Sequence, residues 1–174
     1  MHDFNNSLAK SNVASDMPIW AEIYKKAFPD MVAMVDHRQN GEHQKAGIDR
    51  SIIFENSKQI LVDEKIRFPN QNGKSYSDIL LEHISNDTKN LPGWVCKPLR
   101  ADYICYAISG LGIAYLLPVI QLQQAWKNNS EEWIKLYGSK PAKNTNYNTW
   151  NTPVTAPVLF AAINDCLKIE FVKL

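Results

Sequence analysis

Two β-like segments joined by a short turn constrain the fold of this chain more than any other feature of its sequence. Residues 46–54 and 59–67 are rich in isoleucine and other residues that favour strands, and the turn residues Glu55–Lys58 lie between them. This pattern is typical of a β-hairpin. The chain is therefore expected to contain a sheet, with this hairpin as its best-defined part.

The register of the hairpin decides which charged side chains meet. A turn centred on Asn56 places Asp49 directly opposite Asp63, whereas a turn centred half a residue later places Glu64 there. We prefer the first register, because side chains alternate between the two faces of a strand and Lys65 then shares the face of both aspartates. Two like charges opposite each other cost up to about 1 kcal/mol when exposed and more when buried.

Two converging carboxylates need a compensating cation. Mg²⁺, or Mn²⁺ in its place, is a natural partner because hard divalent ions prefer oxygen ligands. The ammonium group of Lys65 would then orient or activate a water beside an ion held by Asp49 and Asp63. Such a site suits phosphodiester hydrolysis, since the metal neutralises charge that grows on the phosphate oxygens. The alternative is an exposed hairpin with mixed charges and no metal.

Helices and strands are predicted in mixed order around the hairpin. An amphipathic helix begins after the predicted N-cap Asp16 and ends at Pro29. Residues 31–36 are predicted to form a strand, with continuation of the helix as the alternative, and 39–43 a polar loop. The remaining predicted elements are strands at 78–84, 101–108, 112–117 and 167–174, and helices at 118–127, 130–138 and 155–165. This order predicts an α/β or α+β fold with a central mixed β-sheet flanked by helices.

Length and composition predict a single domain. The chain has 174 residues, of which 45% are hydrophobic and 21% charged, so disordered, collagen and coiled-coil classes are excluded. We expect a flexible segment over 1–15 and one domain over 16–174. The longest apolar run, around residues 110–120, is shorter than the roughly 20 residues that span a bilayer, and the polar start of the chain is not typical of a signal peptide. A cytoplasmic protein without membrane contact is therefore expected.

Two groups of residues are assigned to packing rather than to chemistry. The three cysteines, Cys96, Cys105 and Cys166, lack the spacing of a disulfide framework or a zinc site, so we expect buried free thiols. Three aromatic residues of the later helices recur at spacings typical of core packing. They are Trp126, Trp133 and Tyr137.

The hairpin resembles the PD-(D/E)XK nuclease superfamily. Members carry an acid on the second strand of the core and an acid-x-lysine tripeptide on the third, and Asp49, Asp63 and Lys65 match these positions. The downstream segments GWVCKPLRADYICYAI and YLLPVIQLQQAW are also similar to parts of some members. The resemblance covers about residues 18–127 and leaves 128–174 as a C-terminal extension.

The resemblance implies a restriction-endonuclease-like fold, whose core is a helix, three strands, a helix and a further strand. It also implies a Mg²⁺-dependent endonuclease that cuts DNA to leave a 5′-phosphate and a 3′-hydroxyl. Two positions depart from the pattern of the superfamily. Ile48 stands in place of the proline before the first acid, and Glu64 stands where members usually carry an apolar residue. Glu64 is interpreted as a further metal ligand, a packing conflict at a sheet edge, or a solvated residue.

Three ionisable residues outside the hairpin are secondary candidates. Glu82 lies in an apolar segment, where an ionised carboxylate is costly unless it is paired or bound to metal. We consider it a third catalytic acid, with a salt bridge or hydrogen bond within the sheet as an equally good alternative. His83 points to the opposite face of an extended segment and is assigned to the core or the surface. Glu22 is assigned to solvent, with contact to the metal cluster as the alternative.

Basic residues near the hairpin are candidates for contacts with DNA phosphates. Tyr76 and Trp94, whose rings can stack on bases, are interleaved with them. The same residues can equally be ordinary surface charge. Because the net charge is only +1, we expect modest affinity for DNA, and a homodimer or a partner subunit would suit double-strand cutting. The candidates are Arg50, Arg67, Lys74, Lys97 and Arg100.

Together these features favour a metal-dependent nuclease that hydrolyses phosphodiester bonds in DNA. The alternative from another functional class is a non-catalytic nucleic-acid-binding or structural module with a nuclease-like fold. A metal-dependent enzyme acting on another phosphate ester is a third hypothesis, because a fold does not determine the substrate.

Overall fold

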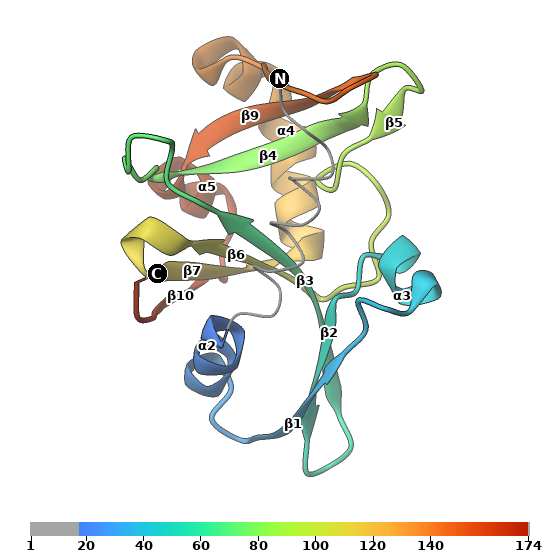
Figure 1. The fold of residues 1–174 in the computed structure, drawn as a ribbon, viewed down its shortest axis with the longest axis vertical. Coiled ribbons are helices and arrows are strands. Elements are labelled where there is room, and N and C mark those ends of the chain that lie inside the picture. The colour runs from blue at the N-terminus through green and yellow to red at the C-terminus, as the bar shows by residue number, and fades with distance from the viewer. Residues whose placement is uncertain (1–17, 174) are drawn as a thin grey trace. The chain divides into compact units, whose positions relative to one another are not determined.

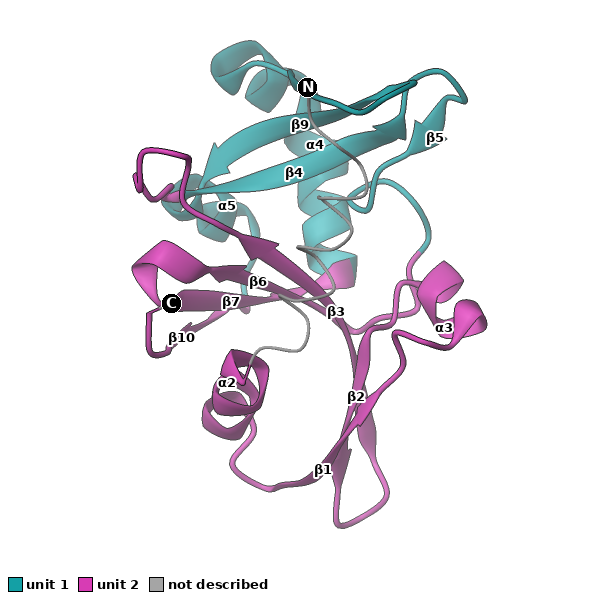
Figure 2. Cartoon of the chain, viewed as in Figure 1, with its two compact units in different colours: residues 1–14, 78–98, 120–164 teal, residues 15–77, 99–119, 165–174 magenta. Residues whose placement is uncertain are grey.

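The computed structural model describes residues 18–173, which form two compact units built from alternating parts of the chain (Figures 1 and 2). Their strands form two sheets, where one central sheet was predicted. The first, which we call the six-stranded unit, comprises residues 18–77, 99–119 and 165–173. The second, which we call the four-stranded unit, comprises residues 78–98 and 120–164.

The six-stranded unit is built on a mixed sheet with the strand order β1-β2-β3-β6-β7-β10 (Figure 1). Neighbouring strands are antiparallel except β3 and β6, which run parallel. The predicted mixed α/β class is therefore confirmed. The strands are β1 (Met31–Asp36), β2 (Arg50–Phe54), β3 (Gln59–Arg67), β6 (Tyr103–Ile108), β7 (Ile113–Pro118) and β10 (Leu167–Glu170).

Helix α2 (Ile19–Ala27) packs on one face of this sheet and encloses a hydrophobic core (Figure 1). Its buried side chains lie three and four residues apart, as the sequence predicts, because this spacing gives a helix one apolar side. The predicted N-cap Asp16 and the predicted flexible segment 1–15 lie outside the described residues. The helix contributes Ile19, Trp20, Ile23 and Tyr24 to the core, and the sheet contributes Ile52, Val62, Cys105, Ala107, Ala114, Leu116 and Ile169.

The β2–β3 hairpin has the predicted register. Arg50 lies opposite Val62, so Asp49, directly before β2, lies opposite Asp63. The backbone N–H of Asp49 donates to the carbonyl oxygen of Val62 at 2.9 Å, which extends the pairing to this position. The alternative register, with Glu64 opposite Asp49, is excluded.

Strand β2 begins later than predicted. We expected a loop over 39–43 followed by a strand from Ala46, but Gly41–Ala46 forms the short helix α3. The side chain of Asn40 accepts hydrogen bonds from two backbone N–H groups of its first turn. Gly47 ends the helix at a φ of 70°, a left-handed conformation that favours glycine. These two caps stabilise a helix whose short sequence shows no apolar periodicity.

The four-stranded unit contains an antiparallel sheet with the strand order β5-β4-β9-β8. The hairpin formed by β8 and β9 was not predicted, because its strands are polar and each contains a proline. The strands are β4 (Asp78–Asn86), β5 (Leu91–Pro92), β8 (Lys140–Lys143) and β9 (Asn148–Thr155), and the helices are α4 (Val119–Tyr137) and α5 (Ala156–Ala162).

Helix α4 is one continuous helix of 19 residues where two shorter ones were predicted. Ser130, the first residue of the second predicted helix, lies inside α4. Trp126 and Trp133 are buried and lie on either side of Ser130, so the apolar side of the helix continues through it. Their predicted place in the core is confirmed, whereas Tyr137 is only partly buried. Among residues 18–173, no helix is long and apolar enough to cross a membrane.

The three cysteines are free, but only Cys105 is fully buried as predicted. Cys166 is half-buried and Cys96 is exposed. Cys96 lies in a tight turn, in which its backbone N–H donates to the carbonyl oxygen of Gly93 at 2.9 Å. The turn directs this thiol out of the core.

Gly93 provides a test of the packing in the four-stranded unit. A Cβ atom at this position would lie 2.2 Å from the backbone oxygen of Glu82. Because backbone atoms cannot move aside as a flexible side chain can, we expect Gly93→Ala to lower the free energy of unfolding by about 1–3 kcal/mol in urea titrations. Gly41→Ala is the control, since a Cβ there has no atom of the described part of the chain within 4 Å. Equal stability of Gly93→Ala and the wild type would contradict the close approach.

Candidate active site

The hairpin brings Asp49, Asp63 and Lys65 together in the six-stranded unit. Asp63 is 4% exposed and its carboxylate contacts the ammonium group of Lys65. The same ammonium donates a weaker hydrogen bond to the backbone oxygen of Glu64 at 3.3 Å. Asp49 is held from the neighbouring strand, because its Oδ2 accepts a hydrogen bond from the backbone N–H of Glu64 at 2.8 Å. Two acids and a cation therefore converge, as the predicted register requires.

The pKa of Asp49 reflects both its burial and the repulsion between two neighbouring carboxylates. The pKa of Asp49 is raised to about 6, mainly by burial and also by the charge of Asp63, while Lys65 opposes the shift. Among the described residues, no group of three or more histidine, cysteine, aspartate and glutamate side chains is placed to hold a metal ion. The donor set is thus a pair of carboxylates. Such a pair fits Mg²⁺, which is commonly held by one or two carboxylates and completes its coordination with water and substrate phosphate oxygens.

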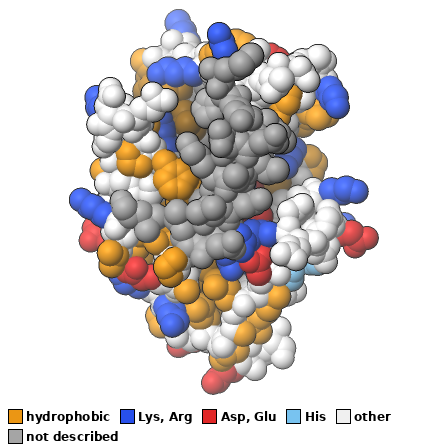
Figure 3. Space-filling model, viewed as in Figure 1, with side chains coloured by type: hydrophobic (Ala, Val, Ile, Leu, Met, Phe, Trp, Pro, Cys, Tyr) orange, Lys and Arg blue, Asp and Glu red, His pale blue; other side chains and the backbone are white. Residues whose placement is uncertain are grey.

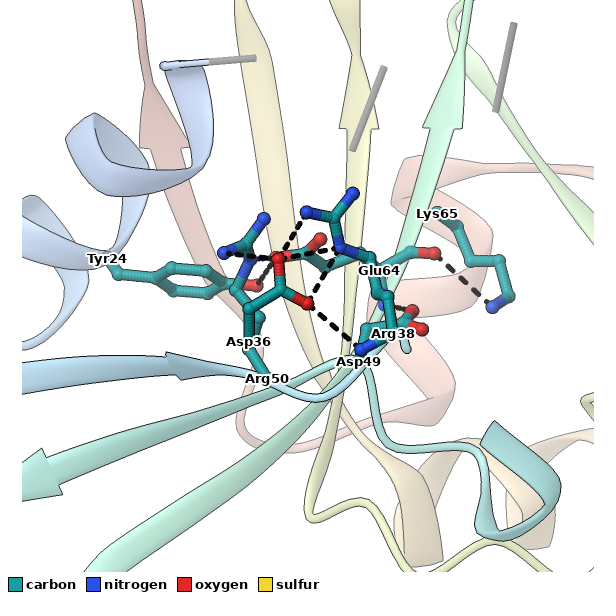
Figure 4. Close-up of polar contacts among 7 residues, drawn as sticks. All are labelled: Tyr24, Asp36, Arg38, Asp49, Arg50, Glu64 and Lys65. Atoms are coloured by element: carbon teal, nitrogen blue, oxygen red, sulfur yellow. Dashed lines mark hydrogen bonds and ion pairs between the residues drawn. The ribbon is translucent and has the colours of Figure 1, made fainter. Parts of the chain in front are cut away.

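Glu64 is directed to the opposite face of β3, as the alternation of side chains requires. Its Oε1 accepts hydrogen bonds from the hydroxyl of Tyr24 at 3.0 Å and from Nε of Arg50 at 2.5 Å (Figure 4). Its Oε2 is buried and has no hydrogen-bond partner within residues 18–173. The pKa of Glu64 is raised to about 7 by burial and by the charge of Asp49, against the opposing effects of Arg50 and Tyr24. The contacts of its Oε1 with Tyr24 and Arg50 give the carboxylate partners within the protein, and its part in metal binding stays a prediction.

Arg50 belongs to an internal ion-pair network rather than to the surface. It is 7% exposed, and its Nη1 lies 3.6 Å from Oδ2 of Asp36. Arg38 pairs with the same carboxylate and, with help from Arg50, lowers the pKa of Asp36 to about 2 (Figure 4). The Arg50 guanidinium is directed to Glu64 and Asp36, so this burial does not support the predicted contact of Arg50 with DNA.

The other predicted basic residues are distributed over both units. Arg67, Lys74 and Arg100 lie in the six-stranded unit, and Lys97 lies in the four-stranded unit. Lys74 and Arg100 are exposed, whereas Arg67 and Lys97 are partly buried. On the surface in Figure 3, lysine and arginine side chains occur at several separate places.

Glu82 and His83 lie on β4 of the four-stranded unit, outside the unit that carries the aspartates. The backbone oxygen of Glu82 accepts a hydrogen bond from Val95 at 3.2 Å, and the role of Glu82 as a third acid stays a prediction. His83 is satisfied within its own unit, as predicted. Its Nε2 lies 2.9 Å from Oγ of Ser139, and its ring stacks on Trp126.

Glu22, which was assigned to solvent, is partly buried and has partners within the six-stranded unit. Its carboxylate forms an ion pair with Lys26, one helical turn later, at 2.8 Å. It also accepts a hydrogen bond from the backbone N–H of Val172 at 3.4 Å. These contacts tie helix α2 to the end of the chain rather than to the aspartates.

Sequence reasoning missed His37, which lies beside Asp49. Its backbone N–H donates to the carbonyl oxygen of Asp49 at 2.8 Å, and its Nε2 lies 2.7 Å from Oγ of Ser51. Its ring stacks on that of His43 at 4.2 Å between centroids. Burial lowers the pKa of His37, and His43 adds to this effect. The place of His37 depends on the pairing of β1 with β2, which no local pattern specifies.

Comparisons with known proteins identify no relative of this chain: no protein-family model, no curated protein and no solved structure matches it.

The buried ion pair provides a test of the network behind β3. Arg50→Ala leaves the Glu64 carboxylate without its charged partner, so we expect a loss of about 3 kcal/mol in the free energy of unfolding, measured in urea. Replacing Glu64 with glutamine in the same chain is expected to recover part of this loss. The control is Arg100→Ala, because an exposed arginine is expected to change stability by no more than about 0.5 kcal/mol. Equal effects of the two arginine substitutions would contradict the network.

The raised pKa of Asp49 predicts how stability depends on pH. Because the folded chain binds this proton more tightly than the unfolded chain, the contribution is fully present below the ordinary pKa of 3.8 and is lost as the pH rises through about 6. Asp49→Asn removes this titration. We therefore expect the variant, in EDTA, to exceed the wild type by about 1–3 kcal/mol at pH 8 and to match it near pH 4.

Glu55→Gln is the matched control for this titration, since Glu55 is an exposed acid at the turn of the same hairpin. Its stability relative to the wild type is expected to be the same at both pH values. An Asp49→Asn variant that is less stable than the wild type at pH 8 would show that the two carboxylates do not repel each other.

Proposed function

We propose that this chain is a metal-dependent nuclease that hydrolyses phosphodiester bonds in DNA. The observation that carries the proposal is the convergence of the buried Asp63 and the partly buried Asp49 with the ammonium group of Lys65. A structural salt bridge needs only one acid for one lysine. The second carboxylate, that of Asp49, has a pKa raised mainly by burial and also by Asp63, and groups with shifted pKa values are concentrated at functional sites.

Asp49 and Asp63 would hold Mg²⁺, or Mn²⁺, through their carboxylate oxygens. When bound, such an ion neutralises charge on the phosphate and lowers the pKa of a bound water. Lys65 orients the attacking water and offers a positive charge to the pentacovalent transition state. The backbone N–H of Glu64 holds the Asp49 carboxylate in a fixed orientation. Attack on phosphorus would leave a 5′-phosphate and a 3′-hydroxyl.

The topology of the six-stranded unit supports a restriction-endonuclease-like core. A helix, α2, precedes three antiparallel strands, β1 to β3, with Asp49 at the start of the second and Asp63 and Lys65 on the third. A further strand, β6, lies parallel to the third. One feature departs from the superfamily's pattern, because the segment between β3 and β6 contains the strands β4 and β5 in place of the expected helix.

Cleavage of DNA tests the proposal directly. Supercoiled plasmid, single-stranded DNA and branched DNA are incubated with Mg²⁺ or Mn²⁺, and with EDTA. We expect metal-dependent cutting by the wild type and a loss of at least about 100-fold in Asp63→Asn and Lys65→Ala, the usual range when a catalytic group is removed. Glu55→Gln and Lys58→Ala are matched controls, because they remove an exposed acid and an exposed lysine from the turn of the same hairpin.

Two outcomes would replace the proposal. A folded wild type that cuts no DNA, and whose melting temperature does not change with Mg²⁺ or Mn²⁺, would favour a non-catalytic binding or structural module. Equal activity of Asp63→Asn and Glu55→Gln would place the chemistry elsewhere in the chain.

A further inference from the structure

Arg67 continues the row of charged side chains on the active-site face of β3. Side chains two residues apart on a strand share a face, so Asp63, Lys65 and Arg67 follow one another on the same side. Two residues of a strand advance by about 6.6 Å. This step is comparable with the separation between successive phosphates along one strand of a nucleic acid.

The guanidinium of Arg67 is held in a defined position. Its central carbon lies 3.9 Å from the centre of the Tyr76 ring, and the group is also hydrogen-bonded to the side chain of Tyr106. The backbone of Arg67 pairs with Ile108 of β6, and its carbonyl oxygen accepts a hydrogen bond from the hydroxyl of Ser109 at 3.2 Å. An arginine held in this way loses little conformational entropy when it binds a ligand.

The surroundings of Arg67 favour the binding of an anionic group to its guanidinium. The side chain is partly buried, and this burial lowers the pKa of the guanidinium while the contact with Tyr106 opposes the shift. Phenol rings hold a guanidinium through the π face and the hydroxyl without adding a formal charge. A phosphate group placed there would form charge-assisted hydrogen bonds with the guanidinium.

We infer that Arg67 binds the phosphate next to the scissile one, so that the substrate is a polynucleotide strand with at least two consecutive phosphates rather than a small phosphate ester. This inference rests on the proposed function, because the scissile position is defined by Asp49, Asp63 and Lys65. Tyr76 and Tyr106 act as positioning residues that hold the guanidinium over the second phosphate.

The first experiment measures binding of a short single-stranded oligonucleotide, with Ca²⁺ in place of Mg²⁺. One phosphate at a time is replaced by an uncharged methylphosphonate. We expect one position at which the replacement weakens wild-type binding about tenfold. Arg67→Gln is expected to bind the unmodified strand about tenfold more weakly, and the slope of its log binding constant against log salt concentration is expected to be smaller by about one. The methylphosphonate at the sensitive position is expected to weaken binding by this variant no further.

The second experiment compares hydrolysis of an oligonucleotide with that of bis(p-nitrophenyl) phosphate, which has a single phosphate. Arg67→Gln is expected to lower kcat/KM for the oligonucleotide about tenfold, mainly through KM, and to leave that for the small diester unchanged. Tyr76→Phe keeps the aromatic ring and is expected to behave as the wild type. Tyr76→Ala is expected to reproduce part of the Arg67→Gln effect. Lys58→Gln, which removes an exposed cation from the hairpin turn, is the control.

The results separate this inference from the proposed function. If Arg67→Gln keeps the methylphosphonate effect at every position, or loses activity equally on both substrates, the role of Arg67 is overturned. Wild-type protein that binds DNA with the expected methylphosphonate effect but cuts neither substrate would overturn the nuclease and keep the phosphate contact. Wild-type protein that binds no DNA would overturn both. Tyr76→Ala provides the same binding test if Arg67→Gln does not fold.

Discussion

Strand β3 carries three consecutive charged residues through the middle of a sheet, and the surroundings of these charges determine most of the six-stranded unit. Asp63 and Glu64 are almost fully buried, and a buried charge is tolerated only when it is paired and hydrogen-bonded. Because successive side chains of a strand alternate, Asp63 and Lys65 need partners on one face and Glu64 needs them on the other. Strand β2 supplies both, with Asp49 on the first face and Arg50 on the second.

The two faces are joined through the backbone of a single residue. The Glu64 carboxylate is held by Tyr24 of helix α2 and by Arg50, while the N–H of the same residue donates to Asp49. The hydrophobic core beneath α2 and the orientation of a candidate metal ligand therefore depend on one short stretch of β3. This connection gives Glu64 a physical role that differs from each of those proposed for it from sequence.

Local patterns were sufficient for elements that have strong periodicity or a clear turn. Helix α2, the β2–β3 hairpin and its register were predicted, and the pairing of Asp49 with Asp63 followed from that register. Elements whose stability comes from capping or from pairing with distant segments were missed. Helix α3 depends on the caps at Asn40 and Gly47, and the β8–β9 hairpin is polar and pairs with β4. Neither of these has an apolar pattern in the sequence.

The sequence by itself determined the mixed α/β class, the hairpin and the presence of two acids and a lysine on one strand face, because these depend on residue alternation and a local turn. Only the tertiary structure decided the surroundings of Arg50 and Arg67, which lie on neighbouring strands. Arg50 is internal because its side chain shares a face with Glu64, whereas Arg67 shares the face of Asp63 and Lys65 and contacts two tyrosines. The physical reason is that the surroundings of a charged side chain depend on segments far away in the sequence. The division of the strands into two sheets likewise depends on pairing between distant segments.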